Sequence, residues 1–388
     1  MKNIQLLNKI AKVGTDRLDP ALYNIGAEVE KPEGIMVRSA KMHEMTFNSE
    51  LLAIARAGAG VNNIPVDRCA EEGIVVFNTP GANANGVKEL ALCALLLASR
   101  KVVDGINWAR SLAGTADVAK QVEAGKSQFG GNELLGKTLG VIGLGAIGGM
   151  VANAAIALGM KVVGCDPYLS VDGAWNLDHH IKHAATYEEV FAAADYITLH
   201  VPATPQTKGM ICASSIALMK EGVKIINLAR AELVDSADIA TALECGKVGA
   251  YVTDFPTDET VKIPGVITIP HLGASTEESE DNCAVMAAEE LDEYLRLGNI
   301  RNSVNYPNVV VSVGGAARVC VLHANVPAVL TNISGVFGKR GINIENMTNK
   351  SRGENAYTIL DINQTVADDV VAEIAAIEGV RRARVICF

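Results

Sequence analysis

The feature that most constrains this chain is a glycine pattern, Gly143-Leu144-Gly145-Ala146-Ile147-Gly148, between a strand pattern and a helix pattern. Residues 138–142 before it are mostly apolar and residues 152–158 after it continue as an apolar helix. In this context the first glycine makes the tight turn, the second leaves room for a pyrophosphate and the third lets the helix pack closely. Unpaired N–H groups at the start of the helix favour phosphate binding. The pattern therefore predicts a dinucleotide-binding β-α-β unit that contacts its cofactor through Gly143, Gly145, Ala146, Ile147 and Gly148.

The choice of dinucleotide depends on an acidic residue after the second strand. Asp166 lies 18 residues past Gly148, at the end of the predicted strand 161–165. A carboxylate at this position accepts hydrogen bonds from the adenosine ribose and repels a 2′-phosphate. The sequence therefore predicts NAD rather than NADP as the cofactor.

The same alternation of strand and helix patterns extends over most of the chain. Further strands are predicted at 35–37, 54–56, 74–77, 196–200, 224–227 and 266–269, and long helices at about 86–110 and 275–298. Strands that alternate with helices are typical of parallel sheets with helices on both faces. We expect an α/β fold whose central part is a Rossmann-type doubly wound domain.

The last part of the chain has a different order of elements. The residues from 302 to 315 contain Pro307 and end in Gly314-Gly315, which is typical of a linker. Beyond it the predicted order is β-α-β-β-α-β, with strands at 318–323, 342–350, 356–362 and 380–386 and helices at 328–340 and 367–377. This order defines a ferredoxin-like unit. We expect a small separate domain over residues 316–388.

Polar residues follow several of the later strands. Arg230, Asp254, Glu259 and His271 each come after a predicted strand, or in the stretch between two of them, and in open parallel sheets ligands bind at the carboxyl ends of the strands. An arginine can bind a carboxylate with two hydrogen bonds. An imidazole can take up a hydroxyl proton near neutral pH, and a carboxylate can orient it. This set of residues suits the oxidation of a 2-hydroxy acid.

Several of these segments, taken in order, resemble the D-2-hydroxyacid dehydrogenase family. They are Gly58-Ala59-Gly60-Val61-Asn62-Asn63, the glycine pattern, Asn227-Leu228-Ala229-Arg230 and the stretch from Pro270 to Thr276. The resemblance implies that Arg230 anchors the substrate, that His271 is the acid and base, and that a glutamate is its partner. It also implies cofactor contacts from Val201, Leu228, Asp254 and Gly273.

The partner carboxylate has two possible registers. The family pattern Asp-Val-Phe-x-x-Glu-Pro is replaced here by Thr253-Asp254-Phe255-Pro256-Thr257-Asp258-Glu259. Alignment on Asp254 selects Glu259, and alignment on Phe255 selects Asp258. We favour Glu259, because its side chain is the family's own type, and keep Asp258 as the alternative.

With its C-terminal module, the chain is similar to the members of the family that oxidise 3-phospho-D-glycerate to 3-phosphohydroxypyruvate, the first step of L-serine synthesis. The resemblance places this substrate on Arg38, Arg56, Gly58, Ala59 and Gly60. An alternative is another 2-hydroxy acid, such as glycerate or lactate. A second alternative, from a different class, is an amino-acid sensor that has lost catalysis.

The resemblance also implies a domain organisation. Residues 1–82 and 275–305 form a flavodoxin-like substrate domain, residues 83–274 the NAD-binding domain, and residues 316–388 an ACT regulatory domain. Three residues, His323, Asn325 and Asn343, match the ACT effector site, which would bind L-serine. Ala328 replaces the usual glycine after Pro327. The long helix 87–110 commonly mediates dimerisation in this family, so we expect a homo-oligomer, a dimer or tetramer.

Composition excludes several other classes of protein. The 34 basic and 44 acidic residues give a net charge of −10, which argues against nucleic-acid binding. The longest apolar run, residues 90–98, is too short to cross a membrane. Eight scattered cysteines without a C-x-x-C pair fit reduced, mostly buried thiols in a cytoplasmic protein. The histidines His179, His180 and His183 lack the glutamate of the zinc motif, so no metal is predicted.

Overall fold

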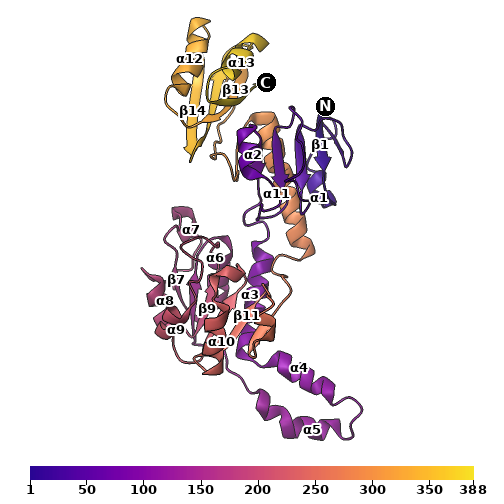
Figure 1. The fold of residues 1–388 in the computed structure, drawn as a ribbon, viewed down its shortest axis with the longest axis vertical. Coiled ribbons are helices and arrows are strands. Elements are labelled where there is room, and N and C mark those ends of the chain that lie inside the picture. Colours follow the sequence, from indigo (N-terminus) through magenta and orange to yellow (C-terminus); the bar gives the residue numbers. More distant parts are fainter. The chain divides into compact units, whose positions relative to one another are not determined.

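The structure is a computed structural model that describes residues 1–388. The chain separates into two compact units (Figure 1). One unit contains Met1–Asn83 together with Glu277–Phe388, and the other contains Ala84–Thr276. The first unit is therefore built from both ends of the chain, and the second from its middle.

The second unit is formed around a seven-stranded parallel sheet with the order β12-β11-β10-β9-β6-β7-β8. Its strands are β6 (Thr138–Ile142), β7 (Lys161–Cys165), β8 (Lys182–His183), β9 (Tyr196–Leu199), β10 (Val223–Asn227), β11 (Val248–Thr253) and β12 (Val266–Thr268). The order reverses between β6 and β9, which is the switch point of a Rossmann-type fold. The predicted doubly wound fold is confirmed.

Helices cover both faces of this sheet (Figure 1). They are α3 (Ala84–Ser99), α6 (Ala146–Ala157), α7 (Val171–Trp175), α8 (Tyr187–Ala193), α9 (Ala213–Leu218) and α10 (Ser236–Glu244). Successive strand residues enter different cores, since Val141 packs with α3 and α6 while Ile142 packs with α8 and α9. Burial on both faces explains why these strands are apolar almost throughout.

The long helix predicted from 86 to 110 is two helices. α3 ends at Ser99, and α4 (Val102–Ser111) follows after a break. Ser99 is buried, and its hydroxyl pairs with the Tyr196 hydroxyl at 2.8 Å, which holds the end of α3 against the sheet. α4 contains no buried residue. It leaves the sheet with α5 (Val118–Gly125) and a 3-10 turn, η1 (Lys126–Phe129) (Figure 1). The helical sequence pattern continues across the break, but the packing of α3 against the sheet ends at Ser99. The sequence pattern therefore did not predict the break.

The first unit contains a five-stranded parallel sheet with the flavodoxin-like order β2-β1-β3-β4-β5. The strands are β1 (Lys2–Leu6), β2 (Tyr23–Gly26), β3 (Gly34–Val37), β4 (Ala53–Arg56) and β5 (Val75–Phe77). The helix α11 (Glu277–Leu297) packs on the sheet and joins its core, and two short helices are α1 (Lys12–Thr15) and α2 (Val66–Glu71). The returning helix at 275–298 was predicted correctly.

Four strands of the sheets, β1, β2, β8 and β11, were not predicted, and β1 and β11 show the reason. β1 has one fully buried residue, Ile4, between half-buried polar ones. β11 contains Gly249, whose Cβ would lie 2.7 Å from the Gly222 carbonyl oxygen. Both strands therefore have weak local patterns, and pairing with their neighbours fixes them.

The C-terminal domain has the predicted β-α-β-β-α-β order. Its elements are β13 (Ala317–Ala324), α12 (Val329–Lys339), β14 (Ile344–Arg352), β15 (Asn355–Ile362), α13 (Asp368–Ala375) and β16 (Val380–Cys387). The antiparallel sheet has the order β14-β15-β13-β16, which is the ferredoxin-like arrangement. Both helices pack on one face, where Ile333, Phe337 and Ile374 are buried.

The other face of this antiparallel sheet packs against the rest of the first unit. Cys320, Leu322 and Tyr357 belong to the same apolar cluster as Tyr294 of α11. The Arg384 guanidinium stacks on the Tyr294 ring at 4.3 Å and donates to the Leu295 carbonyl at 3.2 Å. The sheet is therefore attached to α11 through this apolar cluster and through Arg384.

The first half of the segment predicted as a linker, residues 302–309, is largely packed, whereas most of residues 310–314 are exposed. Asn305, Tyr306 and Val309 are buried, and the Tyr306 hydroxyl donates to the Ala70 carbonyl at 2.7 Å. Even Gly315 is enclosed, because a Cβ there would lie 2.3 Å from the Ile362 carbonyl oxygen. Glycine and proline content indicated a loop correctly but did not reveal its burial.

No helix of the chain is both long enough and apolar enough to cross a bilayer. The eight cysteines are all free thiols, of which Cys69, Cys165, Cys283 and Cys320 are buried. Half of the set is therefore buried, fewer than the sequence analysis expected.

Candidate active site

The glycine pattern forms the turn between β6 and α6. Gly143 has φ +88°, and a Cβ on it would lie 2.6 Å from the His200 carbonyl oxygen. A Cβ on Gly148 would lie 1.9 Å from the Gly143 carbonyl oxygen. Gly143 therefore serves the turn, and Gly148 serves the close approach of helix and strand, as the sequence predicted.

The middle of the turn is open. A Cβ on Gly145 would meet no atom within 4 Å, and no side chain caps the helix that begins at Ala146. Ile147 is in the first turn, whose N–H groups have no partner from a preceding helical turn. The Asp166 carboxylate reaches the same turn and accepts from the Leu144 N–H at 2.8 Å. These residues fit the pyrophosphate and ribose of a dinucleotide.

Two further predicted cofactor contacts lie near the ends of β9 and β10. Val201 is half-buried, and its Cγ1 atom would be 2.9 Å from a Cβ on Gly143. Leu228 is buried and belongs to the core shared with α3 and α6. Both residues thus lie at the carboxyl edge of the sheet. Val201 is beside the glycine turn, and Leu228 is within the core.

A half-buried histidine, His200, also lies behind the glycine turn. The Cβ atom of His200 would be 3.3 Å from a Cβ on Gly148, and its Nε2 atom is 2.9 Å from the Thr198 hydroxyl. Burial lowers the pKa of His200 to about 4. The ring is therefore neutral at neutral pH and acts as a packing element of the turn. The sequence analysis did not single it out.

Three neighbouring parallel strands bring the predicted catalytic residues to one edge. β10, β11 and β12 are adjacent, and they are followed by Arg230, Asp254 and His271, respectively. The backbone of His271 has φ +43°, and its N–H donates to the carbonyls of Asp254 and Ile269, both at 2.9 Å. Two hydrogen bonds to neighbouring loops thus hold this histidine in the left-handed region.

Phe255 lies between the histidine and the arginine. Its ring centroid is 4.6 Å from that of His271, and the Arg230 guanidinium is 5.8 Å from it. The Arg230 Nη1 atom donates to the Ala229 carbonyl at 2.6 Å, which leaves the other guanidinium N–H groups for a ligand. Both the His271 and Arg230 side chains are exposed. This role of Phe255 was not predicted from the sequence, in which the residue served only to set the register of the partner carboxylate.

Asp254 is the buried carboxylate of this edge. It is 1% exposed, and its Oδ2 atom accepts from the Gly273 N–H at 3.0 Å. Its Oδ1 atom has no partner. Burial raises the pKa of Asp254, and the bond from Gly273 and the charges of His271 and Arg230 oppose that shift. A buried acceptor beside the glycine of the histidine loop fits a polar group of a bound cofactor.

The structure leaves the partner carboxylate open. Asp258 and Glu259 are both exposed, in the loop before the 3-10 turn η3 (Thr260–Lys262). Neither side chain forms a hydrogen bond or ion pair, so neither is brought to His271. The choice between them stays a prediction.

The predicted substrate residues lie together in the first unit. The Arg56 Nε atom donates to the Arg38 carbonyl at 3.1 Å, and its guanidinium lies against Gly58, which has φ +148°. Ala59 and Gly60 continue this loop, whose Ala59 carbonyl accepts from the Asn78 side chain at 2.6 Å. The Arg38 guanidinium pairs with Glu280 of α11. Two cations and a glycine loop are thus adjacent.

Two of the predicted effector residues, His323 and Asn325, lie at the end of β13, whereas Asn343 precedes β14 at the other end of the sheet, level with Ala317. His323 is 2% exposed, and its ring nitrogens are 2.8 Å from the Ala324 carbonyl and 2.9 Å from the Thr358 hydroxyl. The Asn325 side chain donates to the Gly353 carbonyl at 3.1 Å, and the Asn343 side chain donates to Glu345 at 2.9 Å. The two asparagines are exposed, whereas the histidine is enclosed.

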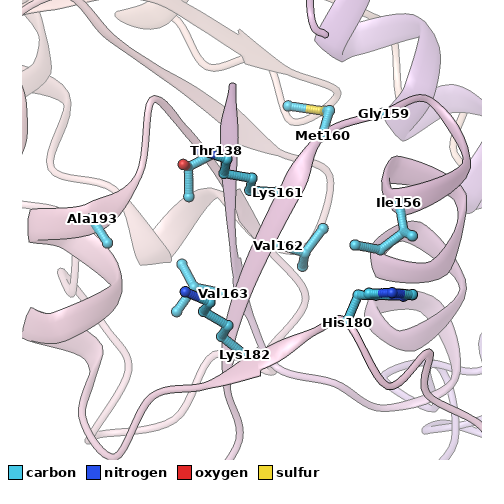
Figure 2. Close-up of a pocket in the computed structure, with 10 residues that line it drawn as sticks. All are labelled: Thr138, Ile156, Gly159, Met160, Lys161, Val162, Val163, His180, Lys182 and Ala193. Atoms are coloured by element: carbon cyan, nitrogen blue, oxygen red, sulfur yellow. The ribbon is translucent and has the colours of Figure 1, made fainter. Parts of the chain in front are cut away.

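Other features of the second unit lie away from this edge. A cavity of about 620 Å³ is found where β6 and β7 begin, lined by Thr138, Lys161 and His180 among others (Figure 2). His180 and His179 group with Asp178, within 4.8 Å of one another, while His183 lies apart in β8. The cavity is at the opposite ends of the strands from the glycine turn.

Comparison with known proteins identifies the class. Residues 94–273 match the family described as D-isomer specific 2-hydroxyacid dehydrogenase, NAD binding domain, and residues 319–382 match an AHAS small subunit-like ACT domain. A D-3-phosphoglycerate dehydrogenase of Methanocaldococcus jannaschii is 39% identical over 266 residues, which is 67% of this chain and 48% of that one. A putative D-3-phosphoglycerate dehydrogenase of Schizosaccharomyces pombe is 34% identical over 81% of this chain and 69% of its own length.

A solved structure gives the same result. The NAD⁺-bound 3-phosphoglycerate dehydrogenase of Entamoeba histolytica is 27% identical, with a TM-score of 0.61 over 78% of this chain and 98% of that one. The chain belongs to the D-2-hydroxyacid dehydrogenase family, and its NAD-binding domain and ACT domain were both predicted correctly. It spans about half the length of several curated relatives, 48% of the first and 55% of another.

Proposed function

We propose that this chain is an NAD-dependent dehydrogenase that oxidises 3-phospho-D-glycerate to 3-phosphohydroxypyruvate, the first step towards L-serine. The observation that carries the proposal is the placement of both Arg230 and His271 next to Phe255, at the carboxyl edge of the NAD-binding sheet. The names of the relatives at 34–39% identity support the substrate.

The first role belongs to Arg230. Its fork is planar and always charged, so it binds the substrate carboxylate with two hydrogen bonds and polarises the neighbouring carbon–oxygen bond. The contact of its Nη1 atom with Ala229 fixes the fork before substrate arrives. Bound NAD would supply the hydride acceptor.

The second role belongs to His271. Its exposed imidazole takes the proton of the substrate hydroxyl at one ring nitrogen, while Phe255 limits the rotation of the ring. Glu259, or Asp258 in the other register, would orient the ring and stabilise its charged form.

The register of that carboxylate has a direct test. If Glu259 is the partner, Glu259→Gln lowers turnover and Asp258→Asn does not. Measurement of kcat for both variants decides, because the two side chains are equally exposed and each substitution removes only the charge. The reverse pattern would assign Asp258.

Arg38, Arg56 and the loop Gly58–Gly60 would bind the phosphate end of the substrate. Two guanidinium groups and backbone N–H groups of a glycine loop are suited to a dianion. Glu280 pairs with Arg38 and competes with the phosphate.

The ACT domain would bind L-serine between paired domains through Asn325 and Asn343, whose side chains are exposed and which lie at opposite ends of the sheet of one domain. His323, which the resemblance placed at the serine hydroxyl, has partners at both ring nitrogens. L-serine should inhibit the parent protein and not Asn325→Ala. A parent protein that serine does not inhibit would remove this role.

The activity is tested with a panel of D-2-hydroxy acids and NAD, with NADH absorbance as the measurement. We expect turnover of 3-phospho-D-glycerate and little turnover of D-glycerate or D-lactate. Turnover of all three acids would point to a general dehydrogenase. Binding of NAD without any turnover would point to a sensor.

A further inference from the structure

A polar cavity in the first unit has no part in the proposed function. It has a volume of about 580 Å³ and lies where three segments meet. These are the turn after β5 with Asn78 and Pro80, the packed segment 302–308, and the Lys350–Arg352 end of β14. The walls of the cavity therefore come from both the ACT domain and the substrate domain.

The walls of this cavity are fixed by hydrogen bonds among the three segments. The Val304 N–H donates to the Val76 carbonyl at 2.9 Å, and the Asn78 N–H donates to the Asn302 carbonyl at 3.3 Å. On the ACT side, Arg352 donates to the Ser303 carbonyl, and the Asn355 side chain donates to Asn305 at 2.8 Å. A ligand would find the walls already in place, so little ordering is needed on binding.

The charged residues that line the cavity are all positive. Lys350 and Arg352 are its charged residues, and the others that line it are asparagine, serine, valine and proline. The Lys350 ammonium group has no hydrogen bond or ion pair. Arg352 uses its Nη1 atom on Ser303, which leaves the rest of its guanidinium for another acceptor. In a chain of net charge −10, a cavity with two cations and no carboxylate is selective for anions.

The acid behind the cavity does not cancel these charges. Glu290 of α11 accepts from the Asn302 side chain at 2.6 Å and is 5% exposed. Burial raises the pKa of Glu290 to about 8, so the carboxyl is mostly neutral at pH 7. Asn302 is thereby held with φ +52°, and its backbone remains at the cavity wall.

We propose that this cavity binds a small organic acid with at least two negative charges, a di- or tricarboxylate or a phosphorylated acid, between Lys350, Arg352 and the Asn308 side chain. Binding would stabilise the contact of the ACT sheet with the turn 78–80. That turn leads directly into Ala84, the first residue of the second unit. A bound acid would therefore couple the ACT domain to the connection between the units.

The test is isothermal titration of the full chain with citrate and with inorganic phosphate. Lys350→Glu should weaken citrate binding by about tenfold or more, and Lys350→Met by less, because the first substitution reverses a charge and the second only removes it. Lys339→Glu is the matched control, since Lys339 is an exposed lysine of the same domain outside the cavity. It should bind citrate like the parent protein.

Arg230→Ala separates this cavity from the proposed active site. Citrate binding that persists in Arg230→Ala and weakens in Lys350→Glu supports the proposal. Binding that is lost in Arg230→Ala and kept in Lys350→Glu would overturn it, and so would a parent protein that binds neither probe at millimolar concentration. Because no step of the test requires turnover, a failed dehydrogenase assay would not change its result.

Discussion

Two histidines at the ends of strands show how differently the two sheets use the same side chain. His271 follows β12 of the parallel sheet, is exposed, and contacts the Phe255 ring. His323 ends the strand pattern of β13 in the antiparallel sheet, is 2% exposed, and has a partner at each ring nitrogen. A ring with a free nitrogen can exchange a proton with a ligand, whereas an enclosed ring must first lose a hydrogen bond.

The arginines of the two sheets differ in the same way. Arg230 is exposed and uses one nitrogen on the backbone. Arg318 is 0% exposed, and its Nε and Nη2 atoms pair with Asp361 at 2.6 and 2.9 Å. Its remaining bonds go to Leu297, Asn299, Val311 and Ser312, outside the antiparallel sheet. The parallel sheet leaves charged groups at its carboxyl edge for ligands, while the antiparallel sheet uses them for attachment.

The largest effect is expected for substitution of His271, the exposed histidine of this comparison. His271→Asn should lower kcat by on the order of 100- to 10,000-fold, because general acid–base transfer contributes that range, while NAD binding is retained. Asparagine tolerates the left-handed backbone at residue 271, so the loop should keep its shape. Kinetics and NAD titration are the measurements. His179→Asn, an exposed histidine of the same unit, is the control and should keep full activity.

A smaller effect is expected for the buried pair. Arg318→Met leaves Asp361 buried without its partner and should lower the free energy of unfolding by about 3–5 kcal/mol. The double variant Arg318→Met/Asp361→Leu removes both charges and should recover part of that loss. Chemical denaturation of both variants is the measurement. Equal stability of Arg318→Met and the parent protein would show that the pair does not attach the sheet.

The smallest effect concerns the pH dependence at the glycine turn. His200 has its pKa lowered to about 4 from 6.5 in the folded state, so the unfolded chain binds more protons between these values. Stability from this residue is therefore complete above pH 6.5 and is lost as the pH falls towards 4. Between neutral pH and about pH 4.5, the free energy of unfolding of His200→Gln should fall by about 2 kcal/mol less than that of the parent protein. Urea denaturation at several pH values is the measurement. If the free energy of unfolding of the two proteins changed with pH in the same way, this prediction would be wrong.

Parts of the fold with a local pattern were predictable. The glycine turn, Asp166 and the C-terminal order of elements depend on spacings within about one β-α unit, and the structure confirms the elements that they imply. β11 was not predicted, because Gly249 makes its pattern weak and its neighbours supply the pairing. The segment 302–315 was taken as a linker, because its burial depends on partners such as Ala70 that are remote in sequence.

The residues of the candidate site also fall into those that the sequence predicts and those that only the structure shows. Arg230, Asp254 and His271 could be named from the sequence, because each follows a strand that ends at the same edge of a parallel sheet. Phe255 between them, and the enclosure of His323, could not be named, because both depend on which side chains meet across strands that pair in three dimensions.

The amino-acid sequence by itself determined the type of each domain and the cofactor class, since turns and strand periodicity are short-range properties of the chain. Only the tertiary structure decided which polar groups are enclosed and which can reach a ligand. Enclosure depends on the packing of distant segments, as at α11 and the antiparallel sheet, and no local pattern contains that information.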